Sequence, residues 1–331
     1  MSGDFRVTLL GTGVPIPSPE RFGPCSLVEA GDQKLLIDAG RGATIRLYQL
    51  HVPIGRIDVQ LLTHYHSDHT SCLPDIWLTG WLESHFGTRK APYKVIGPTG
   101  AKRLMENLER AYADDIKIRV ADEKLPLSGI ATDVTEYDRD GPVYEKNGVK
   151  VIAFEVDHGD VIKPCYGYRI EYGGRVAVFS SDTRYNHNVI KYGKGADLLV
   201  HEVAMARPEL MKEAYIQRII GHHTTPYDCG RIFTQSEARR IHPCGPAREH
   251  RCAAADTART RRRGPADLRW PARGRRGSDV VRDRGCGDGE AADVALLSYT
   301  QEARLKLPDL LRCEWSLMAL AVLAPSIDRL I

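Results

Sequence analysis

The sequence predicts a layered α/β protein in which one β-sheet packs on another and helices cover the outer faces. Three observations predict it. Short apolar runs are bounded by turn residues, helical segments lie between these runs, and strands and helices alternate in two successive groups along the chain. No fixed-period repeat is visible in the chain. Hydrophobic residues make up 42% and charged residues 27% of the 331 residues, which is ordinary for a globular protein.

Eight runs are expected to be strands, because they are apolar or alternate in polarity and end at turn residues. They are Phe5–Leu10, Lys34–Ile37, Asp58–Leu62, Tyr93–Ile96, Lys150–Val156, Tyr166–Glu171, Arg175–Phe179 and Asp197–Val200. The segments with helical periodicity are Thr44–Leu50, Cys72–Leu82, Gly100–Ala113 and Pro226–Thr234. Residues 171–175, Glu-Tyr-Gly-Gly-Arg, predict a hairpin between the sixth and seventh strands.

Targeting and compartment are predicted from features that the sequence lacks. Met1 leads into the run at Phe5 without a basic start or a cleavage site, so we expect no signal peptide. The longest apolar run, near Ser316 to Ala324, is about half the ~20 residues that span a bilayer. The eight cysteines form no CxxC pair and are expected to be reduced thiols. These features predict a cytoplasmic protein that does not enter a membrane.

A dense group of potential metal ligands follows the apolar run Val59–Leu62. His64 and His66 lie two residues apart, so an extended backbone places both rings on one side. Asp68 and His69 come where the chain turns into a helix, and their side chains can face a neighbouring point. Imidazole nitrogen and carboxylate oxygen suit Zn²⁺, and they also bind Mn²⁺ or Fe. A polar loop with chance histidines is disfavoured, because three His and one Asp share six residues.

This H-x-H-x-D-H pattern resembles the signature of the metallo-β-lactamase superfamily, and most closely its ribonuclease Z and arylsulfatase-like branch. Further segments that match the branch are Leu10–Pro15, Leu36–Gly40, Ser181–Thr183, Ala196–Glu202 and His222–Pro226. The matches cover residues 1 to about 236. The resemblance implies that residues 1–236 form a metallo-β-lactamase αββα sandwich, with two packed mixed β-sheets and helices outside.

The resemblance assigns metal ligands position by position. The implied set is His64, His66, Asp68, His69, His158 and Asp182. His158 follows the end of a predicted strand and matches the third ligand of the first metal. A solitary histidine there would be structural as often as not, but the strand-end position and the family match favour a ligand. Asp182 matches the carboxylate that bridges two metals, and its alternative role is a helix N-cap. The family uses Asp38 to support the loop, so we leave it out of the metal shell. The implied cofactor is Zn²⁺ at two sites, with Mn²⁺ or Fe as alternatives.

Catalysis in this family requires a nucleophile and a proton donor for the leaving oxygen. Two metals lower the pKa of a shared water, so that a metal-bound hydroxide attacks the ester, and Asp68 can orient it. Residues 221–226, Gly-His-His-Thr-Thr-Pro, match the element that carries a catalytic histidine. The His-x-Thr-Pro pattern selects His223, whereas alignment with His-Ser-Thr-Thr selects His222.

Glu202, or His201 beside it, is expected to orient this catalytic histidine. In the alternative interpretation, Thr225 caps a helix that begins at Pro226, and the histidines merely pack nearby. Both interpretations place the histidines just before a helix.

The resemblance also implies a seventh ligand, a histidine on a later strand. The chain offers His242 and His250 in a setting rich in Pro, Gly and Arg, where we expect no strand. We therefore assign the role to neither. The remaining six ligands predict one tightly bound metal and a second that is lost on dialysis.

Residues 237–331 differ in character and are expected not to form the native end of the fold. Residues 239–284 contain 14 Arg, no Lys and five acidic residues, a charge of +9, which leaves −6 for the rest against +3 overall. Bases that encode Arg269–Gly285, shifted by one nucleotide, can encode a strand, a turn and a second strand. We interpret the region as the product of a reading-frame change, poorly ordered to about Ala291 and followed by isolated helices. A basic nucleic-acid-binding arm is the other interpretation, which the lack of lysine disfavours.

The resemblance implies a metal-dependent hydrolase of a phosphodiester or sulfate ester. Ribonuclease Z members usually insert a long tRNA-gripping arm between the ligands that match His158 and Asp182, and here only 23 residues separate them. This favours a small ester over a tRNA precursor, so arylsulfatase and cyclic-nucleotide phosphodiesterase activities stand beside RNA cleavage. The alternative class is a catalytically impaired remnant that binds metal or nucleic acid. A homodimer is left open.

Overall fold

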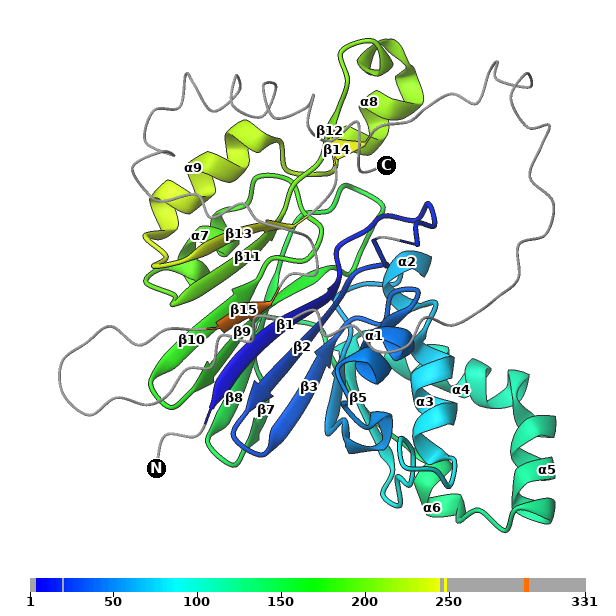
Figure 1. Cartoon of the computed structure of the whole chain (residues 1–331). Helices are drawn as coiled ribbons and strands as arrows, with labels where there is room; N and C mark the ends of the chain where they lie inside the picture. The colour runs from blue at the N-terminus through cyan, green and yellow to red at the C-terminus, as the bar shows by residue number, and fades with distance from the viewer. Residues whose placement is uncertain (1–3, 20, 245–246, 249–294, 298–331) are drawn as a thin grey trace, which may run out of the picture. The chain divides into compact units, whose positions relative to one another are not determined.

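The structure, a computed structural model, describes residues 4–19, 21–244, 247–248 and 295–297. Within them two mixed β-sheets pack on each other, and helices cover their outer faces (Figure 1). This arrangement is the predicted αββα sandwich.

The first sheet has seven strands in the order β15-β1-β2-β3-β4-β5-β6. Their bounds are β1 Phe5–Gly11, β2 Cys25–Ala30, β3 Gln33–Ile37, β4 Val59–Leu61, β5 Tyr93–Pro98, β6 Thr132–Tyr137 and β15 Ala295–Leu297. β1, β2 and β3 pair antiparallel, whereas the pairs from β3 to β6 are parallel. β15 pairs parallel with β1.

The second sheet has six strands in the order β13-β11-β10-β9-β8-β7. Their bounds are β7 Gly141–Lys146, β8 Val149–Glu155, β9 Tyr166–Tyr172, β10 Arg175–Phe179, β11 Leu198–Glu202 and β13 Ile241–Cys244. β7 to β10 form an antiparallel meander, and β10, β11 and β13 are parallel. The short strands β12 Met205–Ala206 and β14 Ala247–Arg248 pair with each other.

Helices occupy the connections between strands. They are α1 Ala43–Gln49, α2 Ser67–Thr70, α3 Leu73–Trp81, α4 Ala101–Ala111, α5 Ala113–Asp122, α6 Leu127–Ile130, α7 His187–Gly193, α8 Ala214–Ile220 and α9 Pro226–Ser236, with 3-10 turns η1 Ile54–Arg56 and η2 Leu210–Lys212. Across the described part of the chain, none of these helices combines the length and apolar character that a bilayer crossing requires.

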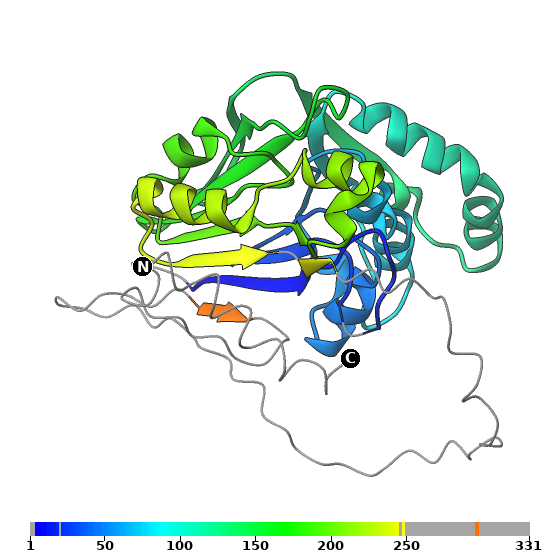
Figure 2. The ribbon, with the colours of Figure 1, turned by 90° about the horizontal axis from the view of Figure 1, so that it is seen from above.

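Alternating burial along the strands explains how the layers assemble. In β8, Val149, Val151 and Ala153 face the core between the sheets, where they meet apolar residues of the first sheet such as Val7. A second core lies between the first sheet and the helices α1, α3 and α4, and it includes the fully buried Trp77. A third core joins the second sheet to α7 and α9, which Figure 2 shows on one side of the molecule's strands.

All eight predicted strands and all four predicted helical segments are present, with small differences at their ends. The hairpin at residues 171–175 joins β9 to β10, as predicted. The sequence analysis missed β2, β6, β7, β12, α5, α6, α7 and α8. β6 and β7 carry only partly buried or exposed residues, so their apolar signal is weak.

The expectation that regular structure ends near residue 237 is wrong for residues 241–244. They form β13, which pairs parallel with β11 in the register Leu199 with Ile241 and Glu202 with Cys244. Hydrogen bonds from Leu199 N to Arg240 O and from Val203 N to Cys244 O, both 2.9 Å long, hold the strand in place. His250, the segment 249–294 and the segment 298–331 lie outside the described residues, and so do the reading-frame and basic-arm interpretations of them.

Candidate metal centre

The site lies at one edge of the sandwich, where loops leave the ends of strands from both sheets. β3 and β4 are parallel, so the loops that follow Ile37 and Leu61 share an edge of the first sheet. β8, β10 and β11 run in one direction in the second sheet, so the loops after Glu155, Phe179 and Glu202 also share an edge. The loops after Leu61, Glu155 and Phe179 carry the predicted ligands, and His222 and His223 follow α8 in the connection after Glu202. This explains how segments far apart in sequence meet.

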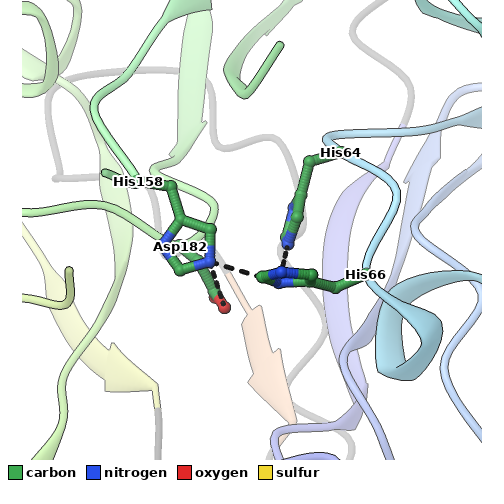
Figure 3. Close-up of side chains that lie close together, drawn as sticks. All are labelled: His64, His66, His158 and Asp182. Atoms are coloured by element: carbon green, nitrogen blue, oxygen red, sulfur yellow. Dashed lines mark hydrogen bonds and ion pairs between the residues drawn. The ribbon is translucent and has the colours of Figure 1, made fainter. Parts of the chain in front are cut away.

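The first cluster consists of His64, His66, His158 and Asp182, whose ligand atoms lie within 4.8 Å of one another (Figure 3). The ring centroid of His158 lies 5.1 Å from those of both His64 and His66. His66 Nδ1 is 3.1 Å from His64 Nε2 and 3.3 Å from His158 Nε2. Asp182 Oδ2 is 3.7 Å from His158 Nε2. The structure therefore brings these four predicted ligands together around one point.

The second cluster shares Asp182 and adds His69 and Asp68. His69 Nε2 lies 3.4 Å from Asp182 Oδ2 and 3.9 Å from Asp68 Oδ2. This nitrogen is buried and has no hydrogen-bond partner among the described residues. Buried polar atoms are seldom left without a partner, so the donor set fits a cation at this position.

Asp38 holds a residue next to the first cluster and a residue of the second cluster in place. Its Oδ1 accepts a 2.9 Å hydrogen bond from Thr63 N, and its Oδ2 accepts one of 2.9 Å from Thr63 Oγ1. The same Oδ2 lies 2.7 Å from His69 Nδ1, so Nδ1–H donates to the carboxylate and Nε2 faces the site. Asp38 and Ser181, the residue before Asp182, both have left-handed φ angles, of 59° and 60°. Such strain is common where backbone is bent to aim a functional side chain.

Burial and the neighbouring charges keep most of the candidate ligand atoms unprotonated, as metal binding requires. Burial lowers the pKa of His64 well below its usual value, lowers that of His66, and lowers the pKa of His158 to about 4. These imidazoles are neutral at pH 7 and offer lone pairs to a metal. Burial acts to lower the pKa of His69 and to raise that of Asp182, but their mutual attraction reverses both shifts. Asp182 therefore keeps its negative charge although its side chain is only partly exposed.

Glu202, at the end of β11, organises the opposite wall. Its Oε1 accepts hydrogen bonds from Thr183 N at 3.1 Å and Thr224 N at 2.9 Å. The same oxygen lies 3.1 Å from His223 Nδ1. A histidine held at Nδ1 by a carboxylate keeps a fixed ring orientation and presents Nε2 outward.

His222 takes a different position from His223. The backbone oxygen of His222 lies 2.9 Å from His158 Nδ1, so this ring nitrogen donates to the carbonyl and leaves Nε2 for the first cluster. The ring nitrogens of His158, His222 and His223 also approach one another closely enough to form a second potential metal-binding group. Both His222 and His223 line the cavity.

His201 makes no side-chain hydrogen bond to His222 or His223 among the described residues, contrary to one expectation. Its ring is fully buried and packs edge-on against Phe233 of α9, with centroids 6.1 Å apart. Neighbouring strand residues point to opposite faces, so His201 faces the helix layer when Glu202 faces the site. Of the two candidates, only Glu202 contacts His223.

A cavity of about 330 Å³ opens over the two clusters. Its lining includes Asp68, His69, Asp182, His222, His223 and Cys244. The sequence analysis missed Cys244, because Pro243 and the neighbouring glycine hid the strand that presents it. It also missed Ser180, whose Oγ accepts a 3.1 Å hydrogen bond from Glu202 N.

Comparison with known proteins identifies the family of this chain. The model of the family described as anti-Pycsar protein Apyc1 matches residues 5–217. A ribonuclease Z of Mycobacterium bovis (strain BCG / Pasteur 1173P2) is 37% identical over 215 residues, which are 65% of this chain and 75% of the relative. The chain belongs to the Apyc1 family and, with its ribonuclease Z relatives, to the metallo-β-lactamase superfamily.

Solved structures agree on the fold. Human tRNase Z, short form, has a TM-score of 0.58 at 23% identity, over 72% of this chain and 91% of that one. The metallo-β-lactamase fold protein YhfI from Bacillus subtilis has a TM-score of 0.57 at 21% identity, over 73% and 86% of the two chains. The Apyc1-family chain is thus a metal-dependent hydrolase of ester bonds, of the phosphodiester type. The sulfate-ester alternative finds no support among these matches.

Proposed function

We propose that this protein is a two-metal phosphodiesterase whose substrate is small, such as a cyclic nucleotide, rather than a tRNA precursor. The observation that carries the proposal is the segment between His158 and Asp182. Its strands, β9 and β10, are both inner strands of the second sheet, and none of this segment is an arm beside the site. The cavity of about 330 Å³ is near the lower end of the ~300–1,000 Å³ typical of small-molecule sites.

The surface charge supports the same conclusion. α4 and α5 stand out from the body in Figure 1 and are the elements most like an arm. They carry five basic and five acidic residues, so they offer no positive surface for an RNA backbone. Outside residues 239–284 the chain has a charge of −6. Proteins that bind nucleic acid typically have lysine and arginine clustered on one face.

The residues present fit two metal ions, and Zn²⁺ suits this mixture of nitrogen and oxygen ligands. His64, His66 and His158 would hold the first metal, Asp68 and His69 the second, and Asp182 both. Bound metals would polarise the phosphodiester and lower the pKa of the attacking water.

The chain's own groups supply orientation and proton transfer. Asp68 lines the cavity and would orient the attacking water as a hydrogen-bond acceptor. His223 would donate a proton from Nε2 to the leaving oxygen, while Glu202 accepts a hydrogen bond from Nδ1–H and stabilises the charged ring. Of the two candidate histidines, this contact with Glu202 favours His223.

RNA cleavage is the second candidate, because the curated relatives at 37% identity are named ribonuclease Z. An assay on several substrates distinguishes hydrolysis of a small phosphodiester from RNA cleavage. The full chain, loaded with Zn²⁺ or Mn²⁺, is assayed on cyclic nucleotides, a chromogenic bis-phosphodiester, an aryl sulfate and a tRNA precursor, with Asp182→Asn as the control. We expect metal-dependent hydrolysis of the small phosphodiesters and at most weak tRNA cleavage. Efficient tRNA cleavage beside negligible turnover of small phosphodiesters would overturn the proposal.

A further inference from the structure

His158 and Asp182 come from loops that the strands of the second sheet do not hold side by side. They follow β8 and β10, and β9 lies between these two strands. Neighbouring strands are ~4.8 Å apart, so the ends of β8 and β10 are ~10 Å apart. The donor atoms of one zinc ion lie within ~4 Å of each other, because each bond is ~2 Å long. Contacts between the two loops therefore have to set the spacing of His158 and Asp182.

An ion pair joins the two loops. Asp157 precedes His158, and Arg184 lies two residues after Asp182. Arg184 Nε donates to Asp157 Oδ2 at 3.1 Å, and Arg184 Nη2 donates to Asp157 Oδ1 at 2.9 Å. Arg184 N also donates a 2.7 Å hydrogen bond to the backbone oxygen of Asp157. These contacts, the Asp157–Arg184 clamp, fix orientation as well as distance, because the two side-chain bonds are parallel.

The carboxylate of Asp157 also shapes the turn that carries His158. Its Oδ1 accepts a 3.1 Å hydrogen bond from Gly159 N, on the far side of His158. Gly159 has a left-handed φ of 109°, a conformation that favours glycine. His158 therefore lies in a turn that the Asp157 side chain closes, so a shift of Asp157 moves the His158 ring.

Thr183 holds the other loop against the same residue. Thr183 is fully buried, and its hydroxyl oxygen accepts a 3.1 Å hydrogen bond from Asp157 N. Its backbone N donates to Glu202 Oε1 at 3.1 Å, and this oxygen is also 3.1 Å from His223 Nδ1. The loop that carries Asp182 is thus connected both to the turn of His158 and to the partner of His223.

The Asp157–Arg184 ion pair is too exposed to contribute much to the stability of the fold. The side chain of Arg184 is 38% exposed and that of Asp157 is 43% exposed. Ion pairs in such positions add little to the free energy of unfolding, because water screens both charges. Position is the more sensitive quantity, since a displacement of ~1 Å in a site can cost ~10²-fold in activity. The pair therefore matters more for where His158 and Asp182 lie than for whether the chain folds.

We propose that the Asp157–Arg184 clamp is a positioning element of the first metal, which sets metal affinity by holding His158 and Asp182 at one spacing. The inference rests on the proposed function for the assignment of these two residues as ligands of that metal. Arg184 is not among the residues that line the cavity, so it acts through the two ligand loops. The loop that carries His64 and His66 lies outside the clamp, so loss of the clamp weakens metal binding without abolishing it.

The test measures the affinity of the full chain for one equivalent of Zn²⁺ by chelator competition. Arg184→Gln removes the clamp, and we expect ~10–100-fold weaker binding, the usual cost of losing a partner of a ligand. Arg184→Lys keeps the positive charge without the two parallel bonds, so we expect it to recover only part of this loss. With one equivalent of Co²⁺, the visible spectrum of Arg184→Gln is expected to change, because it depends on ligand geometry. Urea unfolding of the chelated protein is expected to stay nearly the same.

Arg119→Gln is the matched control. Arg119 Nε lies 3.1 Å from both carboxylate oxygens of Asp115, and Arg119 Nη1 donates to Glu123 at 2.7 Å. Arg184 likewise reaches a second carboxylate, that of Asp160, at 3.2 Å. The side chain of Arg119 is 29% exposed, and it lies on α5, which contributes no residue to the cavity. We expect Arg119→Gln to leave the Zn²⁺ affinity and the Co²⁺ spectrum unchanged.

Each outcome decides the question. An unchanged Zn²⁺ affinity and Co²⁺ spectrum in Arg184→Gln overturns the proposal, and so does an equal loss of affinity in Arg119→Gln. A large loss of stability in metal-free Arg184→Gln, or its failure to fold, makes the pair a structural contact and also overturns the proposal. A Zn²⁺ affinity that depends on Arg184, in a protein inactive on every phosphodiester, supports the clamp and refutes the proposed function instead.

Discussion

At the scale of single residues, Asp38 contacts two segments of the candidate metal site although it is not one of the predicted ligands. It fixes Thr63, just before His64, and the ring of His69. Replacing such partners costs ~10–100-fold in metal affinity. We expect Asp38→Asn to weaken zinc binding by about that factor in chelator competition. Asp58→Asn is the control, since Asp58 caps Lys34 N at the other end of β4, and an equal loss there would contradict this role.

The roles of His222 and His223 can be distinguished with substrates whose leaving groups differ in basicity. General-acid catalysis contributes ~10²–10⁴-fold, and it matters most when the leaving oxygen is basic. We expect His223→Ala to lower kcat by about that factor on an alkyl phosphodiester, and by much less on a nitrophenyl ester. His222→Ala is expected to lose less on the alkyl substrate. The reverse order of losses would assign the acid to His222.

His201 provides a prediction about stability and pH. Burial lowers its pKa to about 3, and neither ring nitrogen has a hydrogen-bond partner among the described residues. In the unfolded chain a histidine titrates near ~6.5, so between pH 6.5 and 3 the unfolded state binds the extra proton. Folding stability is therefore lost as pH falls below ~6.5, with a slope of up to ~1.4 kcal/mol per pH unit from this group.

We expect His201→Leu to reduce that slope by about one proton's worth in urea titrations of the chelated protein between pH 6.5 and 5. Leucine also removes two buried unpaired nitrogens, so stability at pH 6 is expected to rise. The exposed His85→Leu serves as the comparison. An unchanged slope in His201→Leu would show that the ring is protonated or hydrated in the folded state.

At the scale of elements, α9 begins directly after the loop that carries His222 and His223, so its cap connects the stability of the helix to the position of that loop. Thr225 caps the helix, since its side chain accepts a 3.2 Å hydrogen bond from Asp228 N, and Pro226 occupies the first turn. Both sequence interpretations of this segment are thus compatible: the helix is capped, and the histidines before it face the cavity. Thr225→Ala should cost ~1 kcal/mol of unfolding free energy, measured by urea denaturation. Thr234→Ala, in the same helix, should cost less, and equal losses would argue against a specific cap.

The elements that sequence periodicity predicted are the ones that bury an apolar face by themselves. β8 alternates buried and less buried positions along its length, so its pattern is visible in sequence. β13 does not, because Ile-His-Pro-Cys carries no such alternation, and only its pairing with β11 makes it a strand. Pro243 is tolerated there because β13 is an edge strand of its sheet. Whether such a segment forms a strand depends on the neighbouring strand with which it pairs, and the local sequence does not reveal that partner.

The same distinction applies to the candidate site. Spacing alone indicated His64, His66, Asp68 and His69, because ligands on one strand end must converge. His158 and Asp182 came from the family resemblance, and the structure places both within reach of that group. Cys244 could not be predicted, since its place depends on the register of β13. The reading-frame hypothesis stays a prediction, which the nucleotide sequence around codons 236–245 tests: stop codons in the shifted frame would refute it.

At the scale of the whole molecule, metal binding is expected to stabilise the sandwich, because its ligands come from both sheets. His64 and His66 follow β4 of the first sheet, whereas His158 and Asp182 follow β8 and β10 of the second. A ligand that binds only the folded state stabilises it by ~2.7 kcal/mol at 100 times its dissociation constant. For a domain of this size that raises Tm by roughly 5–10 °C.

Calorimetry with and without a chelator measures this shift. Asp182→Asn removes the carboxylate shared by the two clusters and weakens both sites, so we expect it to abolish most of the zinc-dependent rise in Tm. Asp197→Asn offers a control in the same sheet, since Asp197 accepts a hydrogen bond from Val176 N away from the cavity. It should lower Tm with and without zinc alike and keep the shift between them. A zinc-dependent rise that survives Asp182→Asn intact would mean that the stabilising metal binds outside these clusters, because a cation held between the two sheets cannot lose its shared carboxylate without losing affinity for the folded state.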